Sequence, residues 1–111
     1  MTMPKQIFDS LDDLGRFSEP ALMILISLAE GPKHGYAMTQ DIQAMSGLKL
    51  GPGTLYGAIA RLEECEWIEP LPAEDRRRPY KLTNAGQKVL RARLQSLRAV
   101  TRIGQARLAE N

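Results

Sequence analysis

At 111 residues, with 43% hydrophobic and 25% charged residues, the chain has the size and composition of one ordinary globular domain. Its longest apolar run, Ala21 to Ala29 interrupted only by Ser27, is far shorter than the roughly 20 residues that span a bilayer, so no membrane partner is expected. The amino terminus lacks the apolar core and cleavage site of a secretion signal, which predicts a cytoplasmic protein. Because Cys65 is the only cysteine and His34 the only histidine, we expect no disulfide, no metal site and no other cofactor.

The net charge of +2 hides a strong asymmetry along the chain. Up to Asp75 the sequence carries 5 basic and 12 acidic residues, whereas after Asp75 it carries 10 basic residues and 1 acidic residue. The second part therefore has either an anionic partner or an acidic surface of the same protein to neutralise it, and both can be true.

Two helices are predicted first. A short docking helix should cover residues 7–17, because four apolar residues recur three or four positions apart: Ile7, Leu11, Leu14 and Phe17. Ser18 can cap the second helix, which tolerates Pro20 in its first turn and stops before Gly31 and Pro32. The second helix is apolar on nearly all sides, so it should be the buried central helix.

The next two helices are separated by a short extended link. A third helix should begin near His34 or Gly35 and end at Gly47, with a core face made of Met38, Ile42 and Met45. A fourth helix runs from Pro52 to Cys65, with Pro52 at its first position. Its inner face carries Leu55, Ile59 and Leu62, and its outer face carries Gly53, Gly57, Ala60, Arg61 and Glu64. Small outer residues would allow the helix backbone to approach the edges of DNA bases.

A two- or three-stranded antiparallel wing should follow the fourth helix. Its first strand begins at Trp67, its charged tip covers residues 74–78, and its closing strand covers residues 80–83. Helix, strand, charged turn and strand in this order are typical of a winged helix. The three arginines at the tip suit the phosphates that flank a DNA groove.

The last helix starts at Thr83, whose hydroxyl can cap it, and continues toward Ala109. At 1.5 Å per residue it would be roughly 40 Å long, which is more than a small winged helix can cover. Its apolar stripe consists of Leu90, Leu94, Leu97, Val100 and Ile103. This stripe needs a partner, and a second copy of the chain is the simplest one. The basic side of the same helix could be partly neutralised by Asp9, Asp12 and Asp13.

Three ordered motifs make the chain resemble the PadR-type transcriptional regulators. They are Gly31, Pro32, His34, Gly35 and Tyr36; then Gly53, Thr54, Leu55 and Tyr56; then Arg61, Leu62 and Glu63. The run from Tyr80 to Gly86 is similar to the second wing strand and the start of the dimerisation helix of that family. The resemblance implies a homodimeric winged helix-turn-helix repressor, in which the helix beginning at Pro52 reads the major groove. It also implies a small-molecule or stress signal that releases the DNA.

Two positions depart from the pattern of that family. Glu66 stands where a glycine commonly closes the recognition helix, and a left-handed glutamate would cost roughly 1 kcal/mol. Pro79 precedes the wing tyrosine, where it removes one strand amide and stiffens the edge.

The candidate DNA contacts fall into two groups. Those to base edges, or next to them, are Thr54, Gly57, Ala58 and Arg61. Those to phosphates are Lys33, His34, Tyr36, Lys49, Arg76, Arg77, Arg78 and Lys81. Tyr56 and Tyr80 are amphipathic, so each could either pack in the core or reach a phosphate. Cys65 is expected to be a small buried residue, with a redox switch as the alternative, and Trp67 a plug between helix and sheet.

The sequence divides the chain into an N-terminal docking helix (1–18), a winged helix-turn-helix DNA-binding domain (19–83) and a C-terminal dimerisation helix (84–111). The predicted fold is mainly α with a small wing. The predicted dimer interface comprises Leu11, Leu14, Leu90, Leu94, Leu97, Val100 and Ile103. The predicted function is sequence-specific binding of double-stranded DNA by a homodimer, with an effector of unknown identity.

The alternative is a winged-helix module for protein assembly that binds no DNA, because this fold does not by itself guarantee nucleic-acid binding. Under that alternative, the basic last helix would bind an acidic protein. An enzyme is not expected, since the residues supply neither a nucleophile with a nearby base nor a phosphate-cradling glycine loop.

Overall fold

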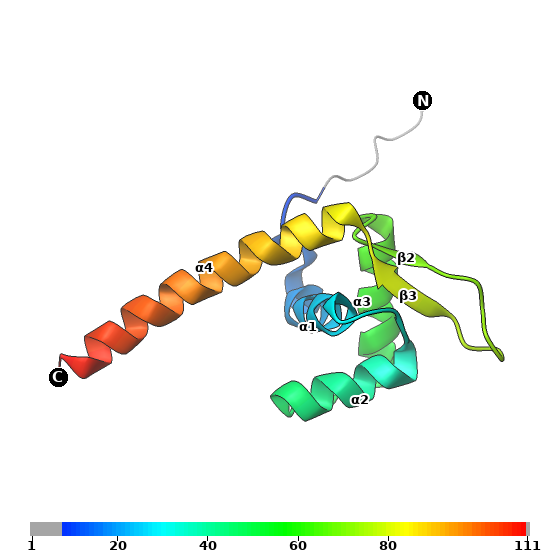
Figure 1. Ribbon diagram of the computed structural model, residues 1–111, viewed down its shortest axis with the longest axis horizontal. Coiled ribbons are helices and arrows are strands. Elements are labelled where there is room, and N and C mark those ends of the chain that lie inside the picture. Colours follow the sequence, from blue (N-terminus) through cyan, green and yellow to red (C-terminus); the bar gives the residue numbers. More distant parts are fainter. Residues whose placement is uncertain (1–7, 111) are drawn as a thin grey trace.

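The computed structural model describes residues 8–110 (Figure 1). It is mainly helical with one small sheet. The elements in chain order are η1 (Leu11–Phe17), α1 (Ser18–Ala29), β1 (Lys33–His34), α2 (Gly35–Ser46), α3 (Pro52–Glu64), β2 (Ile68–Pro70), β3 (Pro79–Leu82) and α4 (Asn84–Ala109). The predicted fold class is therefore confirmed.

The first segment differs from the continuous helix expected over residues 7–17. Ile7 lies outside the described residues, and η1 is a 3-10 helix interrupted at Gly15, which has a φ of 58°. The Asp13 carboxylate accepts hydrogen bonds from the backbone N–H groups of Asp9 and Ser10, at 2.9 and 3.2 Å, and so fixes the start of η1. Ser18 is not the cap of α1 but its first residue, because the chain enters α1 directly from η1.

The core forms around α1, as expected for a helix that is apolar on nearly all sides. η1, α2, α3, α4 and β3 all pack against α1. Fully buried side chains at its centre include Ile24 and Leu25. Burial of this one helix thus holds the other elements in position.

The predicted ends of α2 are confirmed. His34 caps the first turn, since its Nδ1 accepts from the N–H of Ala37 at 3.4 Å, and Gly47 ends the helix with a φ of 77°. Met38 and Ile42 are buried, but Met45 is 43% exposed. The prediction of Met45 in the core is therefore wrong, because the last turn of α2 extends past the other elements (Figure 1).

The sheet has the order β1-β3-β2, and both pairings are antiparallel. Lys33 and His34 pair with Tyr80 and Pro79, so the loop before α2 supplies the third strand of the wing. The Pro79 carbonyl also accepts from the N–H of Leu71 at 2.8 Å. At the wing tip, Asp75 and Arg76 have φ values of 46° and 67° between the mutually hydrogen-bonded Glu74 and Arg77.

The wing and α4 are joined by a compact set of hydrogen bonds. The Thr83 N–H donates to the Trp67 carbonyl at 3.1 Å, and the Thr83 hydroxyl donates to the Glu66 carbonyl at 2.6 Å. The same hydroxyl accepts from the Gly86 N–H at 3.0 Å, which confirms Thr83 as the cap of α4. Glu66 has the left-handed conformation foreseen for it, with a φ of 63°, and Trp67 is buried.

The helix α4 extends well beyond the body formed by the other elements (Figure 1). It has 26 residues, and only its first part, up to Leu90, contributes buried residues. None of the helices within residues 8–110 combines the length and the apolar character needed to cross a membrane.

Candidate nucleic-acid interface

Three segments meet on one side of the molecule: the start of α2, the first turns of α3 and the wing. The pairing of β1 with β3 brings His34 beside Pro79, and the Tyr56 hydroxyl lies so near Gly35 that a Cβ there would be 2.7 Å from it. This arrangement brings His34 and Tyr56 close to the wing, although they come from sequence positions about 20–45 residues before its tip.

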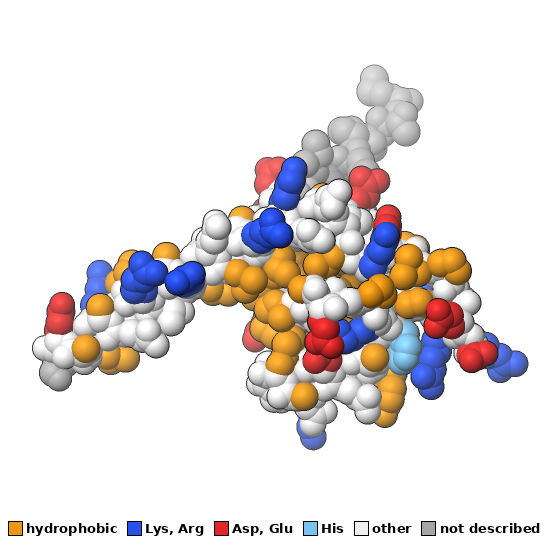
Figure 2. Space-filling model, viewed as in Figure 1, with side chains coloured by type: hydrophobic (Ala, Val, Ile, Leu, Met, Phe, Trp, Pro, Cys, Tyr) orange, Lys and Arg blue, Asp and Glu red, His pale blue; other side chains and the backbone are white. Residues whose placement is uncertain are grey.

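His34 and Arg77 approach each other at the base of the wing tip. Arg77 Nη1 lies 3.3 Å from His34 Nε2, while His34 Nδ1 accepts the capping hydrogen bond from Ala37. A guanidinium can only donate, so His34 Nε2 accepts from Arg77 in one tautomer of the imidazole, and Nδ1 accepts from Ala37 in the other. The contact joins the wing tip to the start of α2. Figure 2 shows His34, the only histidine of the chain, beside acidic and basic side chains of this region.

The remaining cations of the wing differ in how they are held. Arg76 is exposed at the tip, whereas the guanidinium of Arg78 donates to the Leu71 carbonyl at 3.2 Å. Lys81 forms an ion pair with Glu69 across the sheet, with Nζ and Oε1 3.1 Å apart. Within residues 8–110, Arg76 is thus the wing cation whose side chain has neither a hydrogen bond nor an ion pair.

Lys33 was predicted to contact a phosphate, but its ammonium is held inside the chain. Its ammonium donates to the Ser27 carbonyl and lies 3.9 Å from carboxylate oxygens of both Glu30 and Asp41. Only 15% of its side chain is exposed. Since its charge is already compensated inside the chain, Lys33 stabilises the junction of α1, β1 and α2 and is not free to contact a phosphate.

The predicted base contacts on α3 also need correction. Thr54 is exposed, but Ala58 is fully buried, because it lies on the inner arc of the helix next to Leu55 and Leu62. Gly57 faces the ring of Phe17, and a Cβ there would be 2.7 Å from Phe17 Cε1. Ala58 is therefore excluded as a base contact, and the small residue at position 57 serves the packing of Phe17.

Arg61 contacts the same ring. Its guanidinium carbon lies 3.9 Å from the centroid of Phe17, and its Nη1 donates to the Gly57 carbonyl at 2.9 Å. Arg61 is half-buried and directed along α3 toward the first turns of the helix.

The three tyrosines differ in exposure. Tyr36 and Tyr56 are 62% and 55% exposed, so both present aromatic surface and a hydroxyl to solvent. Tyr80 is half-buried; burial first, and then the nearby carboxylate of Glu63, raise the pKa of Tyr80. Between α2 and α3, Lys49 is exposed.

Of the seven residues predicted at a dimer interface, three are buried within this chain: Leu11, Leu14 and Leu90 are 1%, 6% and 5% exposed. They leave little surface for a partner, because η1 and the start of α4 pack on the core of their own chain. The other four, which are Leu94, Leu97, Val100 and Ile103, are 40–67% exposed. Arg93 on α4 forms an ion pair with Asp12 at 3.0 Å, so part of the expected neutralisation of α4 occurs within the chain.

Comparison with known proteins identifies the family to which the chain belongs. The model of the Transcriptional regulator PadR-like family matches residues 24–92, which is more than half of the chain. The chain belongs to this family. The resemblance inferred from the three motifs is thus confirmed.

Solved structures of similar regulators have the same fold. A transcriptional regulator from Clostridium thermocellum is 26% identical with a TM-score of 0.71, and the match covers 85% of this chain and 96% of that one. A PadR family transcription regulator from Clostridium difficile R20291 is 25% identical with a TM-score of 0.72, over 79% of this chain and 96% of that one. A 37.1 kDa protein of transposon TN4556 from Streptomyces fradiae is 44% identical over 82 residues. That match covers 74% of this chain but only 24% of the length of the relative.

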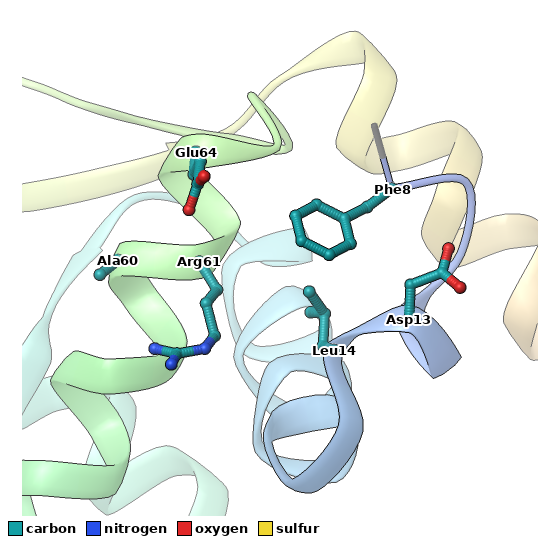
Figure 3. A pocket seen from close by; sticks show the side chains of 6 residues that line it. All are labelled: Phe8, Asp13, Leu14, Ala60, Arg61 and Glu64. Carbon is teal, nitrogen blue, oxygen red and sulfur yellow. The ribbon is translucent and has the colours of Figure 1, made fainter. Parts of the chain in front are cut away.

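One hollow of this PadR-like chain was not predicted. It lies between the N-terminal segment and the outer side of α3, has a volume of about 380 Å³, and is lined by Phe8, Asp13, Leu14, Ala60, Arg61 and Glu64 (Figure 3). Among residues 8–110, no three potential ligands from His, Cys, Asp and Glu cluster closely enough to hold a metal ion. A further cation that sequence reasoning missed is Arg16, whose guanidinium carbon lies 4.8 Å from the Phe17 ring centroid.

Proposed function

We propose that the chain is a sequence-specific DNA-binding transcriptional regulator that acts as a homodimer. The observation that supports the proposal is the position of the exposed wing residues Arg76 and Arg77 beside the start of α2, where Arg77 contacts His34. A guanidinium can donate several hydrogen bonds to phosphate oxygens, and the N-terminus of a helix favours a negative charge. A DNA backbone at this place would therefore meet both favourable features.

The first turns of α3 are suited to reading base edges. Gly53 and Thr54 are exposed, and no atom lies within 4 Å of the position that a Cβ on Gly53 would occupy. The helix surface is therefore open next to a hydroxyl that can hydrogen-bond to bases in the major groove. We assign base reading to Thr54 and its neighbours, and backbone contacts to Tyr36, Lys49 and the wing.

The exposed stripe of α4 supports dimerisation. Leu94, Leu97, Val100 and Ile103 follow one side of a helix that projects from the body of the protein. An apolar stripe of this kind is stabilised when a second helix covers it, and the same stripe on a second copy is self-complementary. A two-fold dimer would present two copies of α3, which bind half-sites about one duplex turn apart.

We further propose that the dimer represses a promoter near its own gene and that a small-molecule or stress signal releases it. The membership of the chain in a family of transcriptional regulators supports the regulatory part. An open hollow of about 320 Å³ lies beside the stripe, between α4 and the end of α1, and includes Ala29, Leu90 and Leu94. A ligand there would change how two copies of α4 pack.

Fluorescence anisotropy with labelled DNA from immediately upstream of the gene tests the proposal. With three or four phosphate contacts per subunit, log K should fall with log salt with a slope of roughly −5 to −7. Scrambled DNA of the same length is the matched competitor. Selective binding with this slope would support the proposal, whereas no binding even at low salt would favour the module for protein assembly.

A further inference from the structure

Two guanidinium groups share one aromatic ring beside α3. The guanidinium carbons of Arg16 and Arg61 lie 4.8 Å and 3.9 Å from the centroid of the Phe17 ring. Arg16 comes from the last turn of η1 and Arg61 from α3, so Phe17 brings together two cations that are 45 positions apart in the sequence. Cation–π attraction holds each side chain at the ring.

Neither guanidinium forms an ion pair with a described residue. Within residues 8–110, no carboxylate oxygen lies within 4 Å of either guanidinium, in contrast to Lys33, Lys81 and Arg93. Two like charges held at one ring repel each other, and an anion beside either of them would relieve part of that repulsion. Arg16 is the more open to an anion, because the hollow that it lines includes no carboxylate.

A hollow next to the ring leaves room for such a ligand. It has a volume of about 370 Å³ and is lined by Arg16, Phe17, Gly53 and Thr54. Gly53 and Thr54 belong to the first turn of α3, which is the part of the helix that we propose reads base edges. An anion in this hollow would therefore lie beside the bases that α3 reads.

The arginine pair lies on the side of α3 away from the wing. At about 100° per residue, Thr54 and Arg61 share one flank of the helix, while Tyr56 and Glu63 share another flank about 160° away. Tyr56 approaches Gly35 at the start of α2, and Glu63 contacts Tyr80 of the wing. A helix in the major groove lies between two phosphate backbones, and the wing accounts for only one of them.

We propose that Arg16, held on the ring of Phe17, binds a backbone phosphate of DNA on the flank of α3 opposite to the wing, and that Arg61 adds positive charge on this flank. This inference rests on the proposed function and adds to it a contact from η1, a segment outside the winged helix itself. In this arrangement, Arg16 contacts the phosphate and Phe17 is a positioning residue.

Acidic residues near Arg61 limit where the phosphate can lie. Asp13 and Glu64 line the neighbouring hollow together with Arg61 (Figure 3). The Asp13 carboxylate is already used by the N–H groups of Asp9 and Ser10. Repulsion from these carboxylates disfavours a phosphate on that side, so the phosphate is placed between Arg16 and Thr54.

Phe17 can hold both arginines only because position 57 is a glycine. A Cβ on Gly57 would lie 2.7 Å and 3.1 Å from two ring carbons of Phe17, and the ring is itself buried. The substitution Phe17→Leu keeps an apolar side chain in the core but removes the aromatic ring. It therefore separates positioning of the arginines from simple burial.

The experiment compares Arg16→Ala with Arg98→Ala, which removes the same charge from an exposed position on α4. Anisotropy with the upstream DNA is measured across a salt series for the full chain. Removal of one phosphate contact per subunit should reduce the magnitude of the salt slope of the dimer by about 2. We expect this change, and about a tenfold loss of affinity, for Arg16→Ala, and less than a twofold loss for Arg98→Ala.

Phe17→Leu gives a second readout. In that background, Arg16→Ala should cost less affinity than it does in the wild type, because the two residues act together. Urea unfolding verifies that each variant is folded. Wild-type binding with Arg16→Ala indistinguishable from Arg98→Ala would overturn the inference and leave the proposed function intact. Failure of the wild type to bind any DNA would overturn both.

Discussion

The substitution Gly86→Ala should destabilise the junction between the wing and α4. A Cβ at this position would lie 2.0 Å from the Trp67 carbonyl oxygen and 2.9 Å from the carbonyl carbon. These are backbone atoms, so no side-chain rotation can relieve the overlap, and the first turn of α4 must move away from Trp67. That movement breaks the hydrogen bond from Thr83 to Trp67 and strains the cap between Gly86 and Thr83.

The magnitude follows from these contacts. Overpacking costs about 1–3 kcal/mol and each lost hydrogen bond about 1 kcal/mol, while alanine gains up to about 1 kcal/mol in helix propensity. The free energy of unfolding should therefore fall by about 1–4 kcal/mol. Urea unfolding followed by circular dichroism, at one fixed protein concentration, measures this change.

Gly53→Ala is the matched control, because Gly53 also lies in a helix but its Cβ would meet no atom within 4 Å. This control should leave stability unchanged or raise it by up to about 1 kcal/mol. If Gly86→Ala unfolded at the same urea concentration as the control, the close contact between α4 and Trp67 would be wrong.

Three further predictions concern the wing, a tyrosine and the stripe of α4. In anisotropy measurements, the double variant Arg76→Ala/Arg77→Ala should reduce the magnitude of the salt slope of a dimer by about 3–4, since it removes two phosphate contacts per subunit; an unchanged slope would remove the wing from the mechanism. Because burial and Glu63 raise the pKa of Tyr80, the neutral phenol stabilises the fold below about pH 10, and this contribution should be lost as the pH rises through the raised pKa. Urea unfolding at several alkaline pH values measures how far the free energy of unfolding falls as the pH rises. This fall should be smaller for Tyr80→Phe than for Tyr36→Phe, which keeps the Tyr80 phenol, and equal falls would contradict the prediction. Val100→Asp places a charge in the exposed stripe and should convert the dimer to a monomer in analytical ultracentrifugation. A variant that stayed dimeric would show that the stripe has no role in assembly.

The parts of the fold that depend on local sequence could be predicted. The cap formed by Thr83, the left-handed end of α2 at Gly47 and the position of Pro52 all follow from neighbouring residues. The left-handed Glu66 was foreseen differently, from the family resemblance, because a glycine commonly stands at this position. Such features are fixed within one turn of the chain, so the sequence contains the necessary information.

The parts that depend on distant contacts could not be predicted. Lys33 is a plausible phosphate contact in the sequence, but folding brings Asp41 and the Ser27 carbonyl to its ammonium. Ala58 is different, because its spacing of three from Leu55 and four from Leu62 already puts it near the inner face of α3, and the expectation from its small size that it lies on the outer face is wrong.

The contact of Phe17 with Gly57 was missed for the same reason. It joins residues 40 positions apart, and no local pattern marks it. In the sequence, Gly57 indicated close approach to DNA, while Arg16 belonged to an acidic segment with no expected role. The packing of η1 on α3 changes both interpretations.

The most direct test of the account is the ratio of the affinities for upstream DNA and for scrambled DNA, measured for the wild type and for Thr54→Val. If α3 reads base edges through its first turn, the wild type should prefer the upstream DNA at least about a thousandfold. The ratio should then fall at least about fivefold in Thr54→Val, which keeps the shape of the side chain but loses the hydroxyl. A wild-type ratio close to one would contradict sequence-specific binding by this surface.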